Sequence, residues 1–183
     1  RSMNDTAATA HAEQVPFLQE KTILATAGIV LVLDQLTKWI TNATLDEGEK
    51  VVVINGFFDF VHWRNPGAAW SILEGQSFFL AIVSIFALWA LIHFREHFEI
   101  GTRTGKLAMG AMIGGIIGNC IDRLAYQEVV DFLKFYVVVD GKEKVYPAFN
   151  IADMGICIGV GLMFVMAWRK TEEEEEDSKE GPA

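Results

Sequence analysis

Four long apolar segments divide the chain. They cover residues 23–40, 78–94, 107–121 and 151–168. Because an α-helix rises 1.5 Å per residue, about 20 apolar residues cross the hydrocarbon core of a membrane. The third segment is short by this measure, so we expect its helix to continue through Leu124 with its polar residues facing protein. The pattern predicts four transmembrane helices.

Glycines recur at helical spacing in the last two apolar segments. Gly110, Gly114 and Gly118 lie in the third segment, and Gly155 and Gly159 lie in the fourth. A spacing of four places small residues on one helix face, where they let a second helix approach closely. At exposed helix positions glycine would only destabilise. We therefore expect these faces to be helix contacts.

Two longer connections between the segments each contain a hairpin signal. In the first, residues 41–76, β-rich runs flank Asn55-Gly56, and residues 66–73 are expected to form a short helix. In the second, residues 122–149, similar runs flank Asp140-Gly141. The predicted strands cover residues 50–54, 57–63, 135–139 and 144–146. Several are apolar on both faces, which favours a small sheet on a membrane surface.

Basic residues near the segment ends predict the orientation. One side carries Lys21, Arg95, Arg103, Lys106, Arg169 and Lys170. Short cytoplasmic loops of membrane proteins carry an excess of Lys and Arg. The opposite side has basic residues only in longer segments, namely Lys50, Arg64, Lys134, Lys142 and Lys144. We expect both termini in the cytoplasm and the two longer connections outside.

Composition and charge refine this division of the chain. Hydrophobic residues make up 51% of the 183 residues, which is high for a soluble protein. The net charge of −9 comes largely from the acidic run at residues 172–177, so the body gives no electrostatic support for nucleic-acid binding. We expect a disordered acidic tail at residues 171–183. Residues 1–21 are interpreted as a tag remnant before Met3 followed by a polar segment without a usual signal peptide, and residues 22–170 as one membrane-embedded domain.

Ionisable and amide residues gather at one end of the apolar segments. Three segments that are distant in the sequence bring acids to one layer on the predicted outer side. The residues are Asp34, Lys38, Asn119, Asp122, Arg123, Asn150 and Asp153, with Asp131 in the loop after the third segment. Ionisable residues in or beside membrane spans are energetically costly, so they are candidates for function.

Two pairs in this layer have structural interpretations. Asp34 and Lys38 lie four residues apart, and we expect an ion pair within one helix that fixes packing. Asp122 stands beside Arg123, and we expect a structural ion pair at the helix end. Neither pair requires catalysis.

The remaining members divide into amides and acids. Asn119 and Asn150 are expected to make hydrogen bonds between helices. Asp131 and Asp153 have no cation nearby in the sequence. An acid at an apolar boundary without a partner is hard to explain by packing, which favours a functional role for these two.

The sequence contains few features that indicate a metal site, a cofactor site or a serine nucleophile. His93 and His97 are expected to be surface residues, because zinc needs three or four convergent ligands. Cys120 and Cys157 lie in apolar runs and are expected to pack as small apolar residues. The sequence has no phosphate-binding loop, no G-x-S-x-G and no H-E-x-x-H. We therefore predict neither a metal nor a cofactor.

Five short segments, in a fixed order along the chain, match the pattern of a known protein family. They are residues 34–38, 64–71, 118–123, 129–132 and 147–153, and together they cover the body from Thr22 to Trp168. In order and spacing they resemble the bacterial lipoprotein signal peptidases, also called type II signal peptidases. Small departures from the family pattern, at Trp70, Tyr146 and Met154, concern the shape of the pocket and remove no acid or amide.

The resemblance implies a fold, a site and an activity. The fold is a membrane α-helical bundle of four transmembrane helices with a small extracytoplasmic β-cradle and a short surface helix. Asp131 and Asp153 would form the catalytic dyad of a membrane aspartyl endopeptidase without cofactor or metal. The residues expected to bind substrate or brace the site are Asp34, Lys38, Asn65, Asn119, Asp122, Arg123 and Asn150.

The resemblance also implies partners and a location. The substrate would be a diacylglyceryl-cysteine prolipoprotein, cut immediately before the lipidated cysteine, and cyclic peptides of the globomycin type would inhibit the enzyme. We expect a monomer among the lipids of the bacterial cytoplasmic (inner) membrane, with the active site toward the extracytoplasmic face. Three alternatives stay open: a proton-coupled transporter or small channel, a non-catalytic membrane adaptor, and a metal-dependent membrane protease. Acids at one boundary and the lack of a repeat disfavour the transporter.

Overall fold

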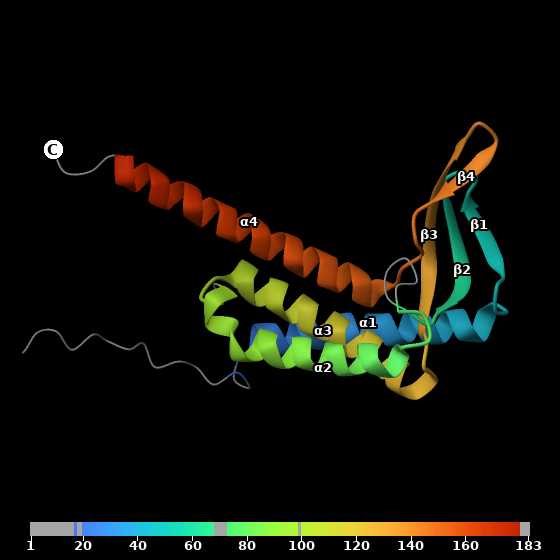
Figure 1. Cartoon of the computed structure of the whole chain (residues 1–183), viewed down its shortest axis with the longest axis horizontal. Helices are drawn as coiled ribbons and strands as arrows, with labels where there is room; N and C mark the ends of the chain where they lie inside the picture. The colour runs from blue at the N-terminus through green and yellow to red at the C-terminus, as the bar shows by residue number, and fades with distance from the viewer. Residues whose placement is uncertain (1–16, 18–19, 68–72, 99, 180–183) are drawn as a thin grey trace, which may run out of the picture.

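The computed structural model describes residues 17, 20–67, 73–98 and 100–179. Its helices are α1 (Lys21–Thr44), α2 (Ser77–His93), the short 3₁₀ helix η3 (Arg95–Phe98), α3 (Arg103–Tyr126) and α4 (Ile151–Lys179). Helix α3 is central, because it packs against α1, α2 and α4. Figure 1 shows α4 close to α3 where α4 begins and diverging from it toward the C-terminus.

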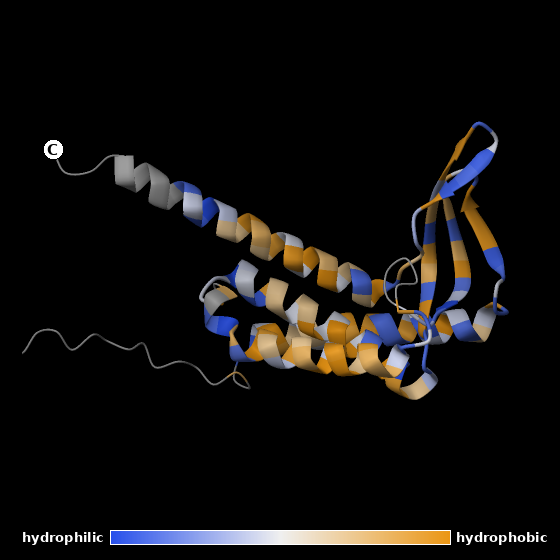
Figure 2. Cartoon of the chain, viewed as in Figure 1, coloured by the Kyte–Doolittle hydropathy of each residue, from blue (hydrophilic) through white to orange (hydrophobic). Residues whose placement is uncertain are grey.

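Within the described residues, three helices are long and apolar enough to cross a membrane, namely α1, α3 and α4 as far as Glu172. Helix α2 is apolar but shorter, with 17 residues. Large apolar side chains such as Val32, Trp39 and Phe164 are exposed on the outside of the bundle. Figure 2 shows hydrophobic residues along most of the helices, with polar residues among them at the end that meets the sheet. This distribution suits a bundle surrounded by lipid.

The predicted glycine faces are helix contacts. A methyl group added to Gly110 would lie 2.7 Å from the carbonyl oxygen of Ile23 on α1. Gly114 meets Ala27 on α1 in the same way, and Gly159 on α4 faces the backbone of Ala108 on α3. Glycine lets the helices approach to backbone contact, as the spacing of these residues predicts.

The four strands form one antiparallel sheet in the order β1-β2-β3-β4. They are β1 (Lys50–Ile54), β2 (Phe58–Asn65), β3 (Val129–Val139) and β4 (Lys142–Val145). Both predicted hairpins are confirmed. The sheet lies across one end of the helix bundle, where α1 ends and α4 begins (Figure 1).

Strand β3 differs from the sequence-based prediction. It begins at Val129, whereas the prediction began at residue 135, so Asp131 lies on a strand and not in a loop. The added part of β3 pairs with the end of β2, Arg64 opposite Val130 and Asn65 opposite Val129. Aspartate is uncommon in strands, so the residues around Asp131 do not by themselves predict a strand. Pairing with the distant β2 makes them one.

One further expectation is contradicted, and another falls outside the described residues. The acidic run expected to be disordered continues α4 as a helix to Lys179. Glutamate and lysine favour helix, and extending an existing helix avoids the cost of a new nucleus. The short helix expected at residues 66–73 falls mostly on residues 68–72, which lie outside the described residues.

Candidate active site

Asp131 and Asp153 line the same cavity at the junction of the sheet and the bundle. The cavity has a volume of about 530 Å³, and Asn65, Asn119 and Arg123 also line it. Strand β3 supplies Asp131, and the first turn of α4 supplies Asp153. The two acids therefore converge on one space, as the sequence predicts for that layer.

Two amides hold the carboxylate of Asp131. Asn65 Nδ2 donates to Oδ2 at 3.0 Å, and Asn150 Nδ2 donates to Oδ1 at 2.8 Å. The side chain of Asp131 is only 4% exposed. Both oxygens are thus oriented by side chains from other elements.

Asp153 is fixed by the start of its own helix. Its backbone N–H donates to Asn150 Oδ1 at 2.9 Å, and its Oδ2 accepts from the backbone N–H of Asn150 at 3.2 Å. This reciprocal pair is a capping box, which satisfies two free N–H groups at the helix start. Asn119 Nδ2 donates to the other oxygen, Oδ1, at 2.7 Å.

Asn150 connects the two acids. Its side chain is fully buried and donates to Asp131, while its backbone N–H donates to Asp153. The same Nδ2 lies 3.2 Å from Asn119 Oδ1 and 3.2 Å from the carbonyl oxygen of Val130. Asn150 therefore contacts both carboxylates, that of Asp131 through its side-chain amide and that of Asp153 through its backbone N–H.

Lys38 is the buried cation beneath the acids. Its Nζ lies 2.8 Å from Asp34 Oδ2, 2.9 Å from Asp122 Oδ2 and 2.9 Å from Asn119 Oδ1. The predicted Asp34–Lys38 pair within α1 is confirmed. Three oxygen acceptors match the three N–H bonds of an ammonium group, so the buried charge is fully partnered.

The predicted Asp122–Arg123 ion pair is wrong. Asp122 turns to Lys38, because consecutive residues on a helix point about 100° apart. Arg123 instead reaches backbone oxygens of Asn119 and Gly67, each at 3.5 Å, and its Nε has no hydrogen-bond partner within the described part of the chain. Among the described residues, the guanidinium of Arg123 therefore has a donor without a partner at the cavity wall.

Gln35 is a site residue that sequence reasoning missed. Its Nε2 lies 3.1 Å from Asp34 Oδ2 and 3.0 Å from Asp122 Oδ1, so it bridges α1 and α3. The other oxygen of Asp34 accepts from the backbone N–H of Ala152 at 2.9 Å. The signal available was a neutral polar residue next to Asp34 inside an apolar segment.

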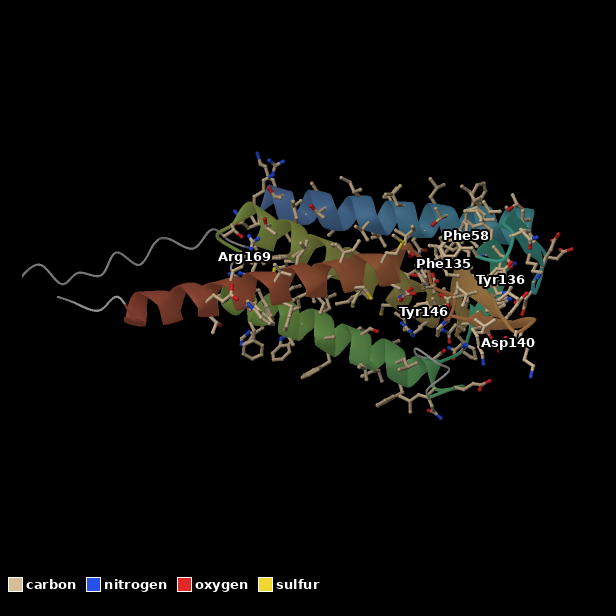
Figure 3. All side chains as sticks on the ribbon, turned by 90° about the horizontal axis from the view of Figure 1, so that it is seen from above. Phe58, Phe135, Tyr136, Asp140, Tyr146 and Arg169 are labelled. Atoms are coloured by element: carbon tan, nitrogen blue, oxygen red, sulfur yellow. The ribbon has the colours of Figure 1, made fainter. Side chains whose placement is uncertain are left out.

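An aromatic row leads from the sheet to the cavity. Phe58 stacks on Phe135 with ring centres 4.8 Å apart, and Phe135 stacks on Phe149 at 5.8 Å. Tyr146 meets Phe149 edge-on at 6.1 Å, and both line the cavity. Figure 3 shows Phe58, Phe135 and Tyr146 at the end of the bundle where α4 begins. The part of the cavity wall formed by Tyr146 and Phe149 is therefore aromatic.

The environment of Asp131 raises its pKa from 3.8 to about 7. Burial is the largest cause, since a charged carboxylate loses hydration, and the charge of Asp153 is the next. The hydrogen bond from Asn65 acts in the opposite direction. A carboxyl group with this pKa keeps a substantial protonated fraction near neutral pH.

Histidines and cysteines are the other side chains that could serve as functional groups. Among the described residues, no group of three or more His, Cys, Asp or Glu side chains is placed to hold a metal. His93 is exposed as expected, and the side chain of His97 lies outside the described residues. Cys120 is buried, whereas Cys157 is exposed and lines the cavity one turn after Asp153.

Known proteins are similar to this chain over most of its length. A family model described as signal peptidase (SPase) II matches residues 26–169. The chain belongs to the signal peptidase II family. It is 40% identical over 146 residues to a lipoprotein signal peptidase of Listeria monocytogenes serotype 4a (strain HCC23), covering 78% of this chain and 92% of that protein. It is 38% identical over 137 residues to that of Bacillus subtilis (strain 168), covering 75% and 86%.

Two solved structures of bacterial membrane enzymes are similar to this chain in fold and sequence. One, described as a bacterial membrane enzyme solved by the in meso method at 2.3 Å resolution, gives a TM-score of 0.73 at 34% identity and covers 84% of this chain and 91% of its own. A second, at 1.9 Å resolution, gives a TM-score of 0.66 at 35% identity, with 80% and 92% covered. The chain is accordingly an aspartic-type membrane peptidase, and the resemblance found in its motifs is confirmed.

Proposed function

We propose that this protein removes the signal peptide of diacylglyceryl-cysteine prolipoproteins by cutting immediately before the lipidated cysteine, with Asp131 and Asp153 as the catalytic dyad. Membership of the signal peptidase II family supports cleavage of lipoprotein precursors. The observation that carries the residue assignment is the convergence of the two carboxylates on one cavity, linked through Asn150.

Peptide hydrolysis needs an activated water and a donor to the carbonyl oxygen. Two close carboxyl groups that share one proton supply both, because the second ionisation is opposed by the first charge. The ionised carboxylate removes a proton from water, and the resulting hydroxide attacks the scissile carbonyl carbon. The protonated carboxyl donates its proton to the developing oxyanion. The other carboxyl then delivers the proton that it took from water to the departing amine. The pair titrates as a unit, and the raised pKa of Asp131 supports retention of the shared proton near neutral pH.

The neighbours of the dyad have defined tasks in this mechanism. Asn65, Asn119 and Asn150 orient carboxylate oxygens that would otherwise rotate. Lys38 pairs with both Asp34 and Asp122 behind the dyad and offsets part of their negative charge. Arg123 lines the cavity wall, its Nε has no partner among the residues that the structure describes, and we assign it to a peptide carbonyl of the substrate.

The placement in the membrane follows the same proposal. All four α-helices span the cytoplasmic (inner) membrane of a bacterium, with α2 as the shortest span, both termini in the cytoplasm and the sheet on the extracytoplasmic surface. The dyad then lies where hydrocarbon gives way to water. Its substrate keeps the signal helix and the acyl chains in the bilayer while the peptide bond enters the cavity beside the aromatic row. The protein acts as a monomer without a cofactor.

Incubation of the purified protein in detergent with a lipidated precursor tests the proposed function. Release of a signal peptide ending just before the lipidated cysteine is expected, and a cyclic peptide of the globomycin type should block it. Insensitivity to chelators separates this chemistry from a metal-dependent protease. Proton flux in liposomes without any cleavage would point to a transporter and refute the proposal.

A further inference from the structure

A charged cluster crosses all four strands on the face of the sheet opposite the aromatic row. We call it the sheet clamp, and its members are Lys50 on β1, Asp59 on β2, Lys134 and Tyr136 on β3, and Glu143 on β4. Successive strand residues point to opposite faces, so Asp59 and Lys134 alternate with the stacked Phe58 and Phe135. The mechanism described above uses none of these residues.

The centre of the sheet clamp is the pair of Asp59 and Lys134. Asp59 is fully buried and Lys134 is 4% exposed, although both are charged groups. Lys134 Nζ lies 3.5 Å from Asp59 Oδ2 and 2.9 Å from Glu143 Oε2, and it stands 4.5 Å from the centre of the Tyr136 ring. The Tyr136 hydroxyl donates to Asp59 Oδ1 at 3.3 Å.

The environment of Lys134 favours its charged form. Burial lowers the pKa of Lys134. The hydrogen bonds and charges of Glu143 and Asp59 together raise it by more than burial lowers it, so the net shift of this pKa is upward. Lys50 contributes only at the edge, since its Nζ is 3.9 Å from Asp59 and its side chain is half exposed. Losing one partner of a buried ion pair is strongly destabilising, so the pair resists any rearrangement that separates it.

A β-bulge lies between this pair and the proposed catalytic site. Asp59 is directly opposite Lys134, and Phe60 is opposite Leu133. Past the bulge the register changes by one residue, so that Trp63 is opposite Asp131. The part of β2 beyond the bulge ends at Asn65, which holds Asp131 Oδ2. Bulges bend a strand and redirect its side chains.

The geometry points to Asp59 and Lys134 as a positioning pair that retains this bulge and thereby aims Asn65 at Asp131. Without the pair, β2 before the bulge can move by one residue and recover regular pairing with β3. A shift of one residue would turn Asp59 onto the aromatic face, away from Lys134. The buried charge pair forbids that shift, and the bulge persists. The inference rests on the proposed role of Asp131.

A cross-strand disulfide tests the role of register separately from that of charge. Directly opposite residues of an antiparallel pair are close enough for a disulfide. In the Asp59→Cys/Lys134→Cys variant, the oxidised form should cleave a lipidated precursor with kcat/KM within about threefold of the wild type, since its register is fixed covalently. After reduction, kcat/KM should fall roughly 10- to 100-fold, the scale that small misplacements of catalytic groups produce. Reduction should also shift the pH profile to higher pH, as we expect for Asn65→Leu, because both changes remove the hydrogen bond from Asn65 that lowers the pKa of Asp131.

A second measurement needs no substrate. The Phe60→Cys/Leu133→Cys variant reports the native register, because these residues face each other before the bulge. Adding Lys134→Met should slow formation of the disulfide between the two introduced thiols by roughly fivefold or more, since a one-residue shift turns the thiols to opposite faces. Adding Lys50→Met, the half-exposed control, should leave the rate unchanged.

The outcomes separate the two proposals. Equal activity of the reduced and oxidised Asp59→Cys/Lys134→Cys variant, or an oxidised form that is not rescued, would overturn the positioning role. An unchanged disulfide rate in the Lys134→Met background would overturn it as well. A wild-type enzyme that cuts no lipidated precursor would instead remove the proposed function, while the disulfide rates would still decide whether the pair sets the register.

Discussion

The ammonium group of Lys38 donates to the side-chain oxygen of Asn119 across 2.9 Å, and both groups are buried. An ammonium has no acceptor, so Asn119 must present its oxygen to Lys38 and its NH₂ group elsewhere. That NH₂ group donates to Asp153 at 2.7 Å. A lysine on α1 thus decides how an amide on α3 meets an acid on α4.

Replacing this lysine should damage both stability and catalysis. Lys38→Met leaves Asp34 and Asp122 buried without their cation, which costs roughly 3–5 kcal/mol by analogy with other broken buried pairs. The amide of Asn119 also loses its fixed orientation. Thermal unfolding in detergent should show a lower Tm, and cleavage should fall. The control Lys142→Met removes a charge from an exposed residue and should change neither quantity; an unaltered Tm in Lys38→Met would contradict the account.

Neutralising either member of the dyad should abolish cleavage and leave the fold intact. Asp131→Asn and Asp153→Asn keep the size of each side chain but remove the carboxylate chemistry of the pair. We expect activity at least about 10³-fold below wild type, since the base and the acid of one mechanism are lost together. Cleavage of a lipidated precursor by the purified variants is the measurement, with a thermal melt to establish folding. Full activity in either variant would refute the dyad.

The raised pKa of Asp131 predicts a pH-dependent stability. The folded protein holds this proton up to about pH 7, whereas the unfolded chain releases it near 3.8. The stability contributed by the protonated carboxyl is therefore complete below pH 4 and is lost as the pH rises to about 7. One pKa unit corresponds to about 1.4 kcal/mol, so the loss is at most roughly 4 kcal/mol.

The comparison with Asp131→Asn isolates this contribution. The unfolding free energy of the wild type minus that of the variant should fall between pH 4 and pH 7 and level off above. Chemical or thermal denaturation in detergent at several pH values gives the difference. A difference that rises with pH over this range would show that Asp131 is ionised more readily in the folded protein than in the unfolded chain.

The close contact of α3 with α4 predicts that replacing a glycine at this contact by alanine destabilises the protein, whereas the same replacement at an open position does not. A methyl group on Gly115 would meet the carbonyl oxygen of Ala152 and the side chain of Ile156, so Gly115→Ala should force α3 and α4 apart. Overpacking of this kind costs about 1–3 kcal/mol. At Gly28 on α1 an added methyl group meets nothing within 4 Å, so Gly28→Ala is the matched control.

The readout for both glycines is the Tm in detergent together with cleavage. Gly115→Ala should lower both, because Ala152 lies directly before Asp153 and moves with α4. Gly28→Ala should lower neither. Equal melting temperatures for the two variants would mean that the helices can separate without cost at this contact.

Local pattern alone determined much of this protein. The apolar segments predicted the helices, and Asn55-Gly56 and Asp140-Gly141 predicted the hairpins, since these features depend on residues close in sequence. The polar layer was predictable for the same reason, because an acid in an apolar segment stands out without a structure. The acids Asp131 and Asp153 were singled out in this way.

Only the tertiary structure decided which groups meet. It paired Asp122 with Lys38, 84 positions earlier (122 − 38), in place of the adjacent Arg123, and it placed Asp131 on a strand by pairing β3 with β2. It also brought Gln35 between Asp34 and Asp122. Helical and strand periodicity are encoded within a few residues, whereas the partner of a buried charge depends on how distant segments pack, and that packing leaves no local trace in the sequence.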